Sequence, residues 1–214
     1  MPVPVNSTQA KRPQAWEAHV TALLADLAYT VALGPATVED WLAADEPADG
    51  SRLELILGYY AMTPPPSGSH QHAAYRLSRA VDQALESAGR DDLRVLPAVG
   101  VPISTPLRTA LIPDVVVVDV DVHRLVFEPR NVLLAVEVWS PGNSRKERET
   151  KMAAYAEAGI PHVWLLETPP GNPVAFRGYR LDGSEYALVV KATDGETITA
   201  PGPVPVKIDT SQLR

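Results

Sequence analysis

The chain has 214 residues, 45% of them hydrophobic, which is enough to fill one sizeable core. It contains no cysteine, which excludes disulfides, thiolate metal sites and cysteine nucleophiles and fits a reducing, cytoplasmic compartment. Its net charge of -7 argues against a protein that coats nucleic acid, although a nuclease needs only a local basic surface. No apolar run approaches the roughly 20 residues that cross a bilayer, so we expect no membrane partner.

The N-terminal region contains prolines and basic residues over about twelve positions, which indicates an arm. Apolar residues then recur at helical spacing from Trp16 to Leu27, and Gly34-Pro35 ends the pattern. We expect this helix to cover the edge of its own core or, alternatively, to mediate dimerisation. We therefore divide the chain into an arm with an added helix over residues 1–34 and one domain over residues 35–214.

The next elements are short. Thr37 and Asp40 predict the start of a second helix. The run from Arg52 to Met62 is extended on both sides of Gly58, which predicts a hairpin. A proline-rich connection follows it, and an amphipathic helix is predicted from 69 to 88. Short strands are then expected at 93–96 and 99–103.

Two buried strands each carry one carboxylate. Asp114 directly precedes the apolar run Val115–Val118, and Glu137 lies within Leu133–Trp139 on the face of its bulky apolar neighbours. Carboxylates are rarely buried without a partner. If the strands are adjacent, both acids meet at one rim of a sheet, where their oxygens would suit a hard cation such as Mg²⁺. The alternative is a buried glutamate paired with an arginine or lysine for packing.

A charged helix follows at once, over residues 144–158. Ser144 and Glu147 fit a capping box at its start. Lys151 and Tyr155 share a stripe with Glu147, so Lys151 either joins the two buried acids or forms a solvated pair with Glu147. Three basic residues of this segment are candidate contacts for backbone phosphates or, equally, an ordinary solvated face: Arg145, Lys146 and Arg148.

The C-terminal part predicts a buried strand at 163–167 and a hairpin around Asp182-Gly183-Ser184, followed by a tail pinned by Ile208. His70 and His72 are two apart at a helix start and make a poor chelating pair. No phosphate loop, nucleophile elbow, zinc-protease motif or dinucleotide fingerprint is present.

From about Thr37 to Ile208 the chain resembles the Uma-two endonuclease-like family, a branch of the PD-(D/E)XK nuclease superfamily. The resemblance rests on blocks that occur in the family's order: Arg52-Leu53-Glu54-Leu55-Ile56, Pro64 to Gln71, Pro113-Asp114, Glu137-Val138-Trp139-Ser140-Pro141, Lys151, Tyr155, Ala158-Gly159-Ile160-Pro161 and Trp164. It implies an α/β fold (α+β with a mixed sheet), in which helices flank a mixed central sheet in a restriction-endonuclease-like core.

The resemblance also implies a site. Asp114, Glu137 and the carbonyl of Val138 would bind Mg²⁺ or Mn²⁺. The superfamily's lysine lies two residues after the glutamate, where this chain has Trp139, so Lys151 takes that role from the helix. Three further matches are implied to line the same cleft or to contact substrate: Glu54, His70 and Tyr155. The family's acidic residues near Leu57 and Tyr59 are missing here, which leaves open a member without catalytic activity.

We therefore expect a metal-dependent endonuclease, a homodimer acting on DNA. Lys151 would orient or deprotonate the attacking water, and Glu54 would complete the metal shell. The alternative is a catalytically impaired nuclease-fold module that binds a protein or DNA partner. Acidic side chains locked into separate ion pairs with no opening to solvent would contradict the enzyme hypothesis.

Overall fold

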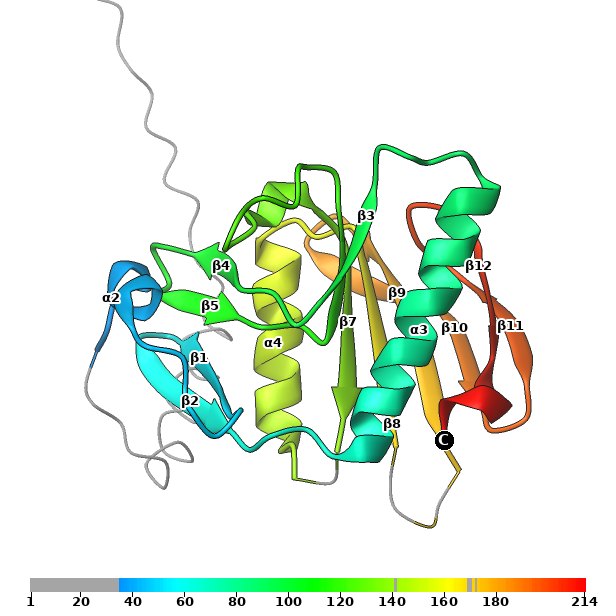
Figure 1. Ribbon diagram of the computed structural model, residues 1–214, viewed down its shortest axis with the longest axis horizontal. Helices are drawn as coiled ribbons and strands as arrows, with labels where there is room; N and C mark the ends of the chain where they lie inside the picture. The colour runs from blue at the N-terminus through cyan, green and yellow to red at the C-terminus, as the bar shows by residue number, and fades with distance from the viewer. Residues whose placement is uncertain (1–34, 141, 169–170, 172) are drawn as a thin grey trace, which may run out of the picture.

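A six-stranded mixed sheet runs through the middle of the computed structural model, which describes residues 35–140, 142–168, 171 and 173–214 (Figure 1). The arm and helix expected over 1–34 lie outside the described residues. The strands of this sheet, in spatial order, are β10 (Glu185–Thr193), β9 (Ala175–Asp182), β8 (His162–Glu167), β7 (Val132–Trp139), β6 (Val115–Val118) and β3 (Arg94–Pro97). β7 and β8 pair in parallel and their neighbours pair antiparallel, which confirms the expected mixed sheet.

Two helices cover opposite faces of this sheet, α3 (Gly68–Ser87) and α4 (Arg145–Glu157) (Figure 1). Parallel strands need a long crossover connection, and α4 supplies it between β7 and β8. Alternation along β7 sends Val136 and Val138 into the core beneath α3, and Ala135 and Trp139 into the core beneath α4. Glu137 therefore faces α4.

A second sheet lies beside the first in the order β2 (Tyr59–Thr63), β1 (Arg52–Ile56), β5 (Thr109–Leu111) and β4 (Val101–Ser104). β1 and β2 form the expected hairpin, whose turn has positive φ at Leu57 (54°) and Gly58 (84°). β5 was not expected. It pairs with β1 through Leu55 and Ala110, and so ties the hairpin to the segment that leads into Asp114.

The remaining elements are small: α2 (Val38–Ala43), the 3-10 helices η1 (Pro129–Asn131) and η2 (Thr210–Leu213), and the hairpin of β11 (Thr197–Ala200) and β12 (Val206–Asp209). The capping box between Thr37 and Asp40 is present at α2. β12 and η2 pack against α3. None of the described helices combines the length and the apolar composition that crossing a membrane requires.

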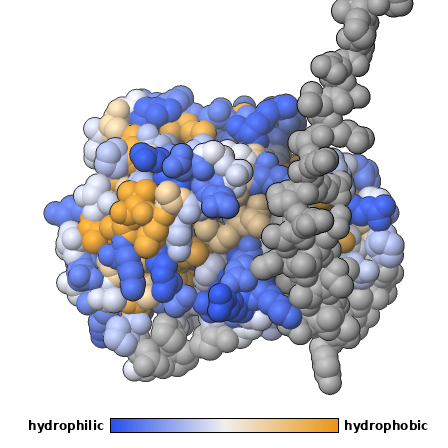
Figure 2. Space-filling model, turned by 180° about the vertical axis from the view of Figure 1, so that it is seen from behind, coloured by the Kyte–Doolittle hydropathy of each residue, from blue (hydrophilic) through white to orange (hydrophobic). Residues whose placement is uncertain are grey.

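On the face seen from behind, apolar side chains gather between hydrophilic ones (Figure 2). The large apolar side chains that remain exposed include Leu188 and Val189 of β10, the first strand of the six-stranded sheet. Some apolar surface is therefore left on the outer strand β10.

Candidate functional site

Asp114 and Glu137 converge at the rim of the central sheet. The antiparallel register of β6 and β7 places Val115 opposite Val136, so the next pair outward is Asp114 and Glu137. The backbone N–H of Val138 donates a 2.7 Å hydrogen bond to Oδ2 of Asp114. The acid just before β6 and the acid near the end of β7 therefore come together at this rim, as expected.

Two basic side chains hold the other oxygen of Asp114. Arg52 Nη1 lies 2.5 Å and His70 Nε2 lies 2.7 Å from its Oδ1. Burial raises the pKa of Asp114, but the hydrogen bond from His70 and the charges of His70 and Arg52 outweigh it, so the pKa lies below its ordinary value. Asp114 is therefore a buried carboxylate that stays ionised.

Lys151 reaches the same region from α4. Its Nζ lies 2.9 Å from Glu54 Oε1 and 3.4 Å from Glu137 Oε1. Glu54 also accepts a 2.8 Å hydrogen bond from the N–H of Ile112, which leads into the Asp114 segment. The interpretation of Lys151 as a solvated partner of Glu147 is wrong, because its side chain is 7% exposed and pairs with these two acids.

The hydroxyl of Tyr155, one turn after Lys151, donates a 2.5 Å hydrogen bond to Oε1 of Glu137. Burial raises the pKa of Tyr155 well above its ordinary value, and the charges of Glu137 and Glu54 add to that effect. Tyr155 has no exposed surface. This position gives Tyr155 a contact with Glu137, and its expected contact with a substrate stays a prediction.

The ionisation of the cluster follows from its burial. Burial raises the pKa of Glu137 to about 7; Lys151 opposes this rise, and Asp114 and Glu54 add to it. Burial lowers the pKa of Lys151, but the charges of Glu137 and Glu54 outweigh it and raise the pKa above its ordinary value. Lys151 is therefore a permanent cation, whereas Glu137 changes its charge near neutral pH.

The cluster is nearly closed to solvent. Asp114 is 3% exposed, Glu137 4% and Glu54 2%. Its most exposed members are Arg52 and His70, whose side chains are 22% and 15% exposed. The carboxylates thus lie in two ion-paired groups, around Asp114 and around Lys151, and the cluster is most exposed to solvent at Arg52 and His70.

The oxygen donors that could hold a hard cation are the carboxylates of Asp114 and Glu137 and the carbonyl of Val138. A strand residue points its N–H and C=O toward the same neighbour, and the N–H of Val138 points at Asp114. Within the described parts of the chain no group of three acidic, histidine or cysteine side chains is arranged to hold a metal. Mg²⁺ is commonly held by only one or two carboxylates, with water and phosphate completing the shell, so this donor set fits it.

The basic residues at the start of α4 lie outside this cluster or are engaged elsewhere. Arg145 is 91% exposed and pairs with Glu149. Lys146 is half-buried. Arg148 donates to Glu167 at 2.8 Å and lies 4.7 Å from the ring centroid of Trp139, so it packs against the end of β7.

Arg52 is the site residue that sequence reasoning missed. It lies two positions before Glu54 in β1, and residues two apart in a strand share a face. That spacing was the available signal: the pair Arg52 and Glu54 brings one cation and one acid to the same side of the hairpin.

The fold and the site together define a restriction-endonuclease-like α/β protein. Residues 38–211 match the model of the Uma2 family, described as "Putative restriction endonuclease", and the chain belongs to this family. Its fold is similar to the crystal structure of a putative nuclease belonging to DUF820 from Anabaena variabilis ATCC 29413, with a TM-score of 0.60 and 15% identity over 84% of this chain and 97% of that one. A comparison with curated proteins found no match.

Proposed function

We propose that the chain is a metal-dependent nuclease that hydrolyses phosphodiester bonds in DNA. The observation that carries the proposal is the position of the Lys151 ammonium between Glu54 and Glu137, at the rim where Asp114 also lies. Membership of a family described as "Putative restriction endonuclease" supports the same reaction. Structural packing alone does not require three acids and three basic side chains to gather at one sheet rim.

The proposed cofactor is Mg²⁺ or Mn²⁺, for which Asp114, Glu137 and the Val138 carbonyl are the ligands. When bound there, the cation supplies neutralisation of phosphate charge and a lower pKa for a coordinated water. The ionised state of Asp114 suits it for this task, because a metal ligand must be deprotonated.

In this proposal Lys151 acts through its charge. The raised pKa keeps its ammonium protonated, so it can orient a water and stabilise the negative charge that develops on phosphate oxygens. A raised pKa favours the charged form, so of the two expected roles the proposal gives Lys151 the orienting one. Glu54 holds the ammonium in place through its 2.9 Å contact, and is a positioning residue rather than a metal ligand.

Arg52 and His70 stand at the entrance and hold Asp114. We propose that they turn toward the phosphate when the substrate arrives, because a phosphate offers both side chains the same charge-assisted hydrogen bonds as the carboxylate. The basic residues Arg145, Lys146 and Arg148 remain candidate contacts for flanking phosphates. We further propose a cytoplasmic homodimer, to be checked by light scattering with and without residues 1–34.

A second candidate is a nuclease-fold module that binds without cleaving. It is favoured by the pairing of every carboxylate in the cluster with a basic side chain, and by the absence of acids at Leu57 and Tyr59. A paired, closed cluster of this kind would be stable without a metal.

Two experiments separate the candidates. Plasmid DNA and a matched RNA are incubated with the purified chain in Mg²⁺, Mn²⁺ or chelator, and we expect cation-dependent cleavage of DNA that Glu137→Ala abolishes while its circular dichroism spectrum stays unchanged. Equal cleavage by Glu137→Ala would exclude the assignment. Calorimetric titration of Mn²⁺ should show binding that is lost in Asp114→Ala, and a silent titration with no cleavage would favour the binding module.

A further inference from the structure

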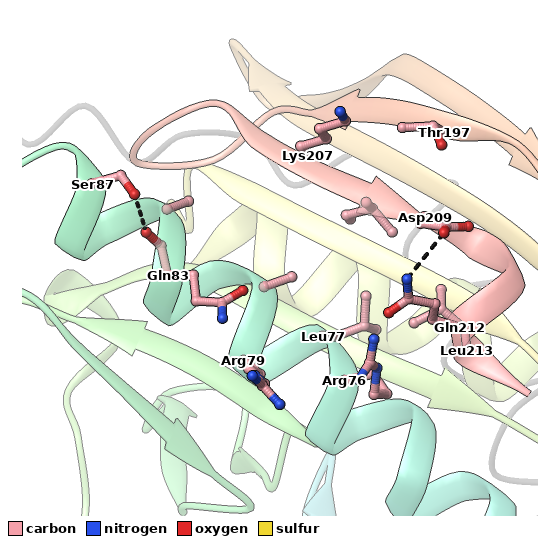
Figure 3. A pocket seen from close by; sticks show the side chains of 13 residues that line it. Arg76, Leu77, Arg79, Gln83, Ser87, Thr197, Lys207, Asp209, Gln212 and Leu213 are labelled. Carbon is pink, nitrogen blue, oxygen red and sulfur yellow. Dashed lines mark hydrogen bonds between the residues drawn. The ribbon is translucent and has the colours of Figure 1, made fainter.

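A pocket of about 660 Å³ lies on the flank of α3, between that helix, the β11–β12 hairpin and η2 (Figure 3). This volume falls within the usual range for small-ligand sites, about 300–1,000 Å³. It shares no residue with the acidic cluster. His70 meets Asp114 in the first turn of α3, and the pocket residues of the helix follow it, from Arg76 to Ser87.

The pocket is basic although the chain as a whole carries a net charge of -7. Arg76 and Arg79 project from α3, and Lys207 comes from β12 on the opposite side (Figure 3). Asp209 is the acidic residue among the lining residues. Gln83 and Gln212 add side-chain amides. Three cations and two amides therefore face one carboxylate.

The carboxylate of Asp209 is already engaged. It accepts hydrogen bonds from the N–H and hydroxyl of Ser211 and from Nε2 of Gln212. These hydrogen bonds hold the pKa of Asp209 below its ordinary value, and the charge of Arg76 makes a smaller contribution. The carboxylate of Asp209 thus caps the start of η2, and most of its acceptor positions are already occupied.

Across the described residues, the side chains of Arg76, Arg79 and Lys207 form no ion pair and no hydrogen bond. The charge of Arg76 acts on Asp209 without direct contact. Arg79 and Lys207 are exposed and Arg76 is half-buried. Other exposed arginines of the chain do find acids, as Arg145 does with Glu149. Unpaired guanidinium groups around a hollow suit a tetrahedral oxyanion, to which arginine donates two parallel hydrogen bonds.

We propose that this pocket binds a phosphate group. The inference goes beyond the proposed function, because it concerns a second site with no residue in the nuclease cluster. The phosphate could belong to a nucleic-acid backbone or to a small phosphorylated molecule, since both offer the same oxygens.

The test compares two triple variants of equal charge. Arg76→Gln, Arg79→Gln and Lys207→Gln remove the cations of the pocket. Arg124→Gln, Arg180→Gln and Lys191→Gln remove three exposed cations elsewhere and serve as the control. Each protein is titrated with a labelled oligonucleotide, followed by fluorescence anisotropy, and with inorganic phosphate, followed by calorimetry. Thermal unfolding and Mn²⁺ binding verify that the fold and the acidic cluster are intact.

We expect the pocket variant to bind at least one probe about tenfold more weakly, while the control binds as the unmodified protein does. Loss of oligonucleotide binding, with a salt slope smaller by about two to three, assigns the site to nucleic acid. Loss of phosphate binding alone assigns it to a small phosphorylated ligand. Equal binding by both variants, or no binding of either probe by the unmodified chain, overturns the proposal. If the triple variant does not fold, the single variants Arg79→Gln and Lys207→Gln, at exposed positions, replace it. Each should then bind the probe about threefold more weakly than the unmodified chain. The readout is binding, so a failed cleavage assay leaves this test intact.

Discussion

Lys151 lies closer to Glu54, which is 97 residues earlier in the chain, than to Glu137 of β7. The Nζ–Oε1 distances are 2.9 Å and 3.4 Å. Glu54 belongs to the β1–β2 hairpin and Lys151 to α4, so this ion pair joins the second sheet to the helix that covers the first. This contact therefore holds the proposed catalytic ammonium in position and links β1 to α4 beside the site.

Removing the ammonium should be costly. Lys151→Met leaves Glu54 and Glu137 buried without their cation, and we expect a loss of about 3–5 kcal/mol in the free energy of unfolding, together with loss of cleavage. Urea denaturation at pH 7 measures the first effect. The exposed Lys191→Met is the control and should change stability by less than about 0.5 kcal/mol. The double variant Lys151→Met/Glu54→Gln should recover part of the stability and none of the cleavage; full recovery of cleavage would remove Lys151 from the mechanism.

The affinity for Mn²⁺ should depend on pH through Glu137. Burial raises the pKa of Glu137 to about 7 from an ordinary value of 4.5, and a metal ligand must be ionised. The apparent affinity should therefore rise between pH 5 and about pH 7 and level off above it. Calorimetric titration across this range in buffers of different ionisation enthalpy should also reveal proton release. An affinity that is flat over this range would contradict the assignment of Glu137 as a ligand.

The same pKa sets the stability of the metal-free protein. Because the folded state holds the proton of Glu137 more tightly than the unfolded state, this group contributes stability that is fully present below pH 4.5 and is lost as the pH rises through about 7. Asp114 contributes in the opposite sense, since its pKa is lowered: its contribution is present above its ordinary value of 3.8 and is lost in acid. Thermal unfolding with and without Mn²⁺ should therefore show a larger stabilisation by the metal at pH 8 than at pH 5. A smaller stabilisation at pH 8 would contradict this sign.

Tyr155→Phe tests whether the buried hydroxyl tunes Glu137. The hydroxyl lowers the pKa of Glu137, so its removal should move the pH profile of Mn²⁺ binding to higher pH and cost about 1 kcal/mol of stability. Because Tyr155 has no exposed surface, KM for DNA should stay unchanged. Tyr75→Phe, at a side chain 59% exposed on α3, is the matched control. A changed KM with an unmoved pH profile would assign Tyr155 to substrate contact after all.

The parts of the fold that the sequence revealed are those with a strong local pattern. β7 could be recognised from its apolar run, α3 from its helical period, and α4 from Ser144 at its start and Gly159 at its end. The meeting of Asp114 and Glu137 also followed from sequence, because each interrupts or opens an apolar strand. These signals are local, and the register of β6 and β7 then places Asp114 next to Glu137.

What the sequence did not reveal depends on contacts between distant segments. β5 has three residues and lies close to Pro113, so it carries no periodic signal. It forms because Ala110 pairs with Leu55 of β1, and because its other two residues pair with β4. The hydrogen bond from Tyr155 to Glu137 needs α4 to lie against β7 at one particular height. Arg52 looked like an ordinary residue at the start of a strand, and only the arrival of Asp114 from 62 residues away gives it a partner.

Arg52 supplies the sharpest remaining prediction, because it and a divalent cation would compete for Asp114. Arg52 Nη1 lies 2.5 Å from Oδ1, the oxygen that His70 also contacts, so two side chains already occupy this oxygen. Arg52→Gln removes the full charge and leaves His70 and the Val138 N–H to hold the carboxylate. We expect the affinity for Mn²⁺ to rise several-fold, with thermal unfolding confirming that the fold is kept. Arg52→Lys retains the charge and should leave the affinity close to that of the unmodified chain. A fall in the Mn²⁺ affinity of Arg52→Gln would contradict this competition. It would mean that Arg52 orients Asp114 toward the metal.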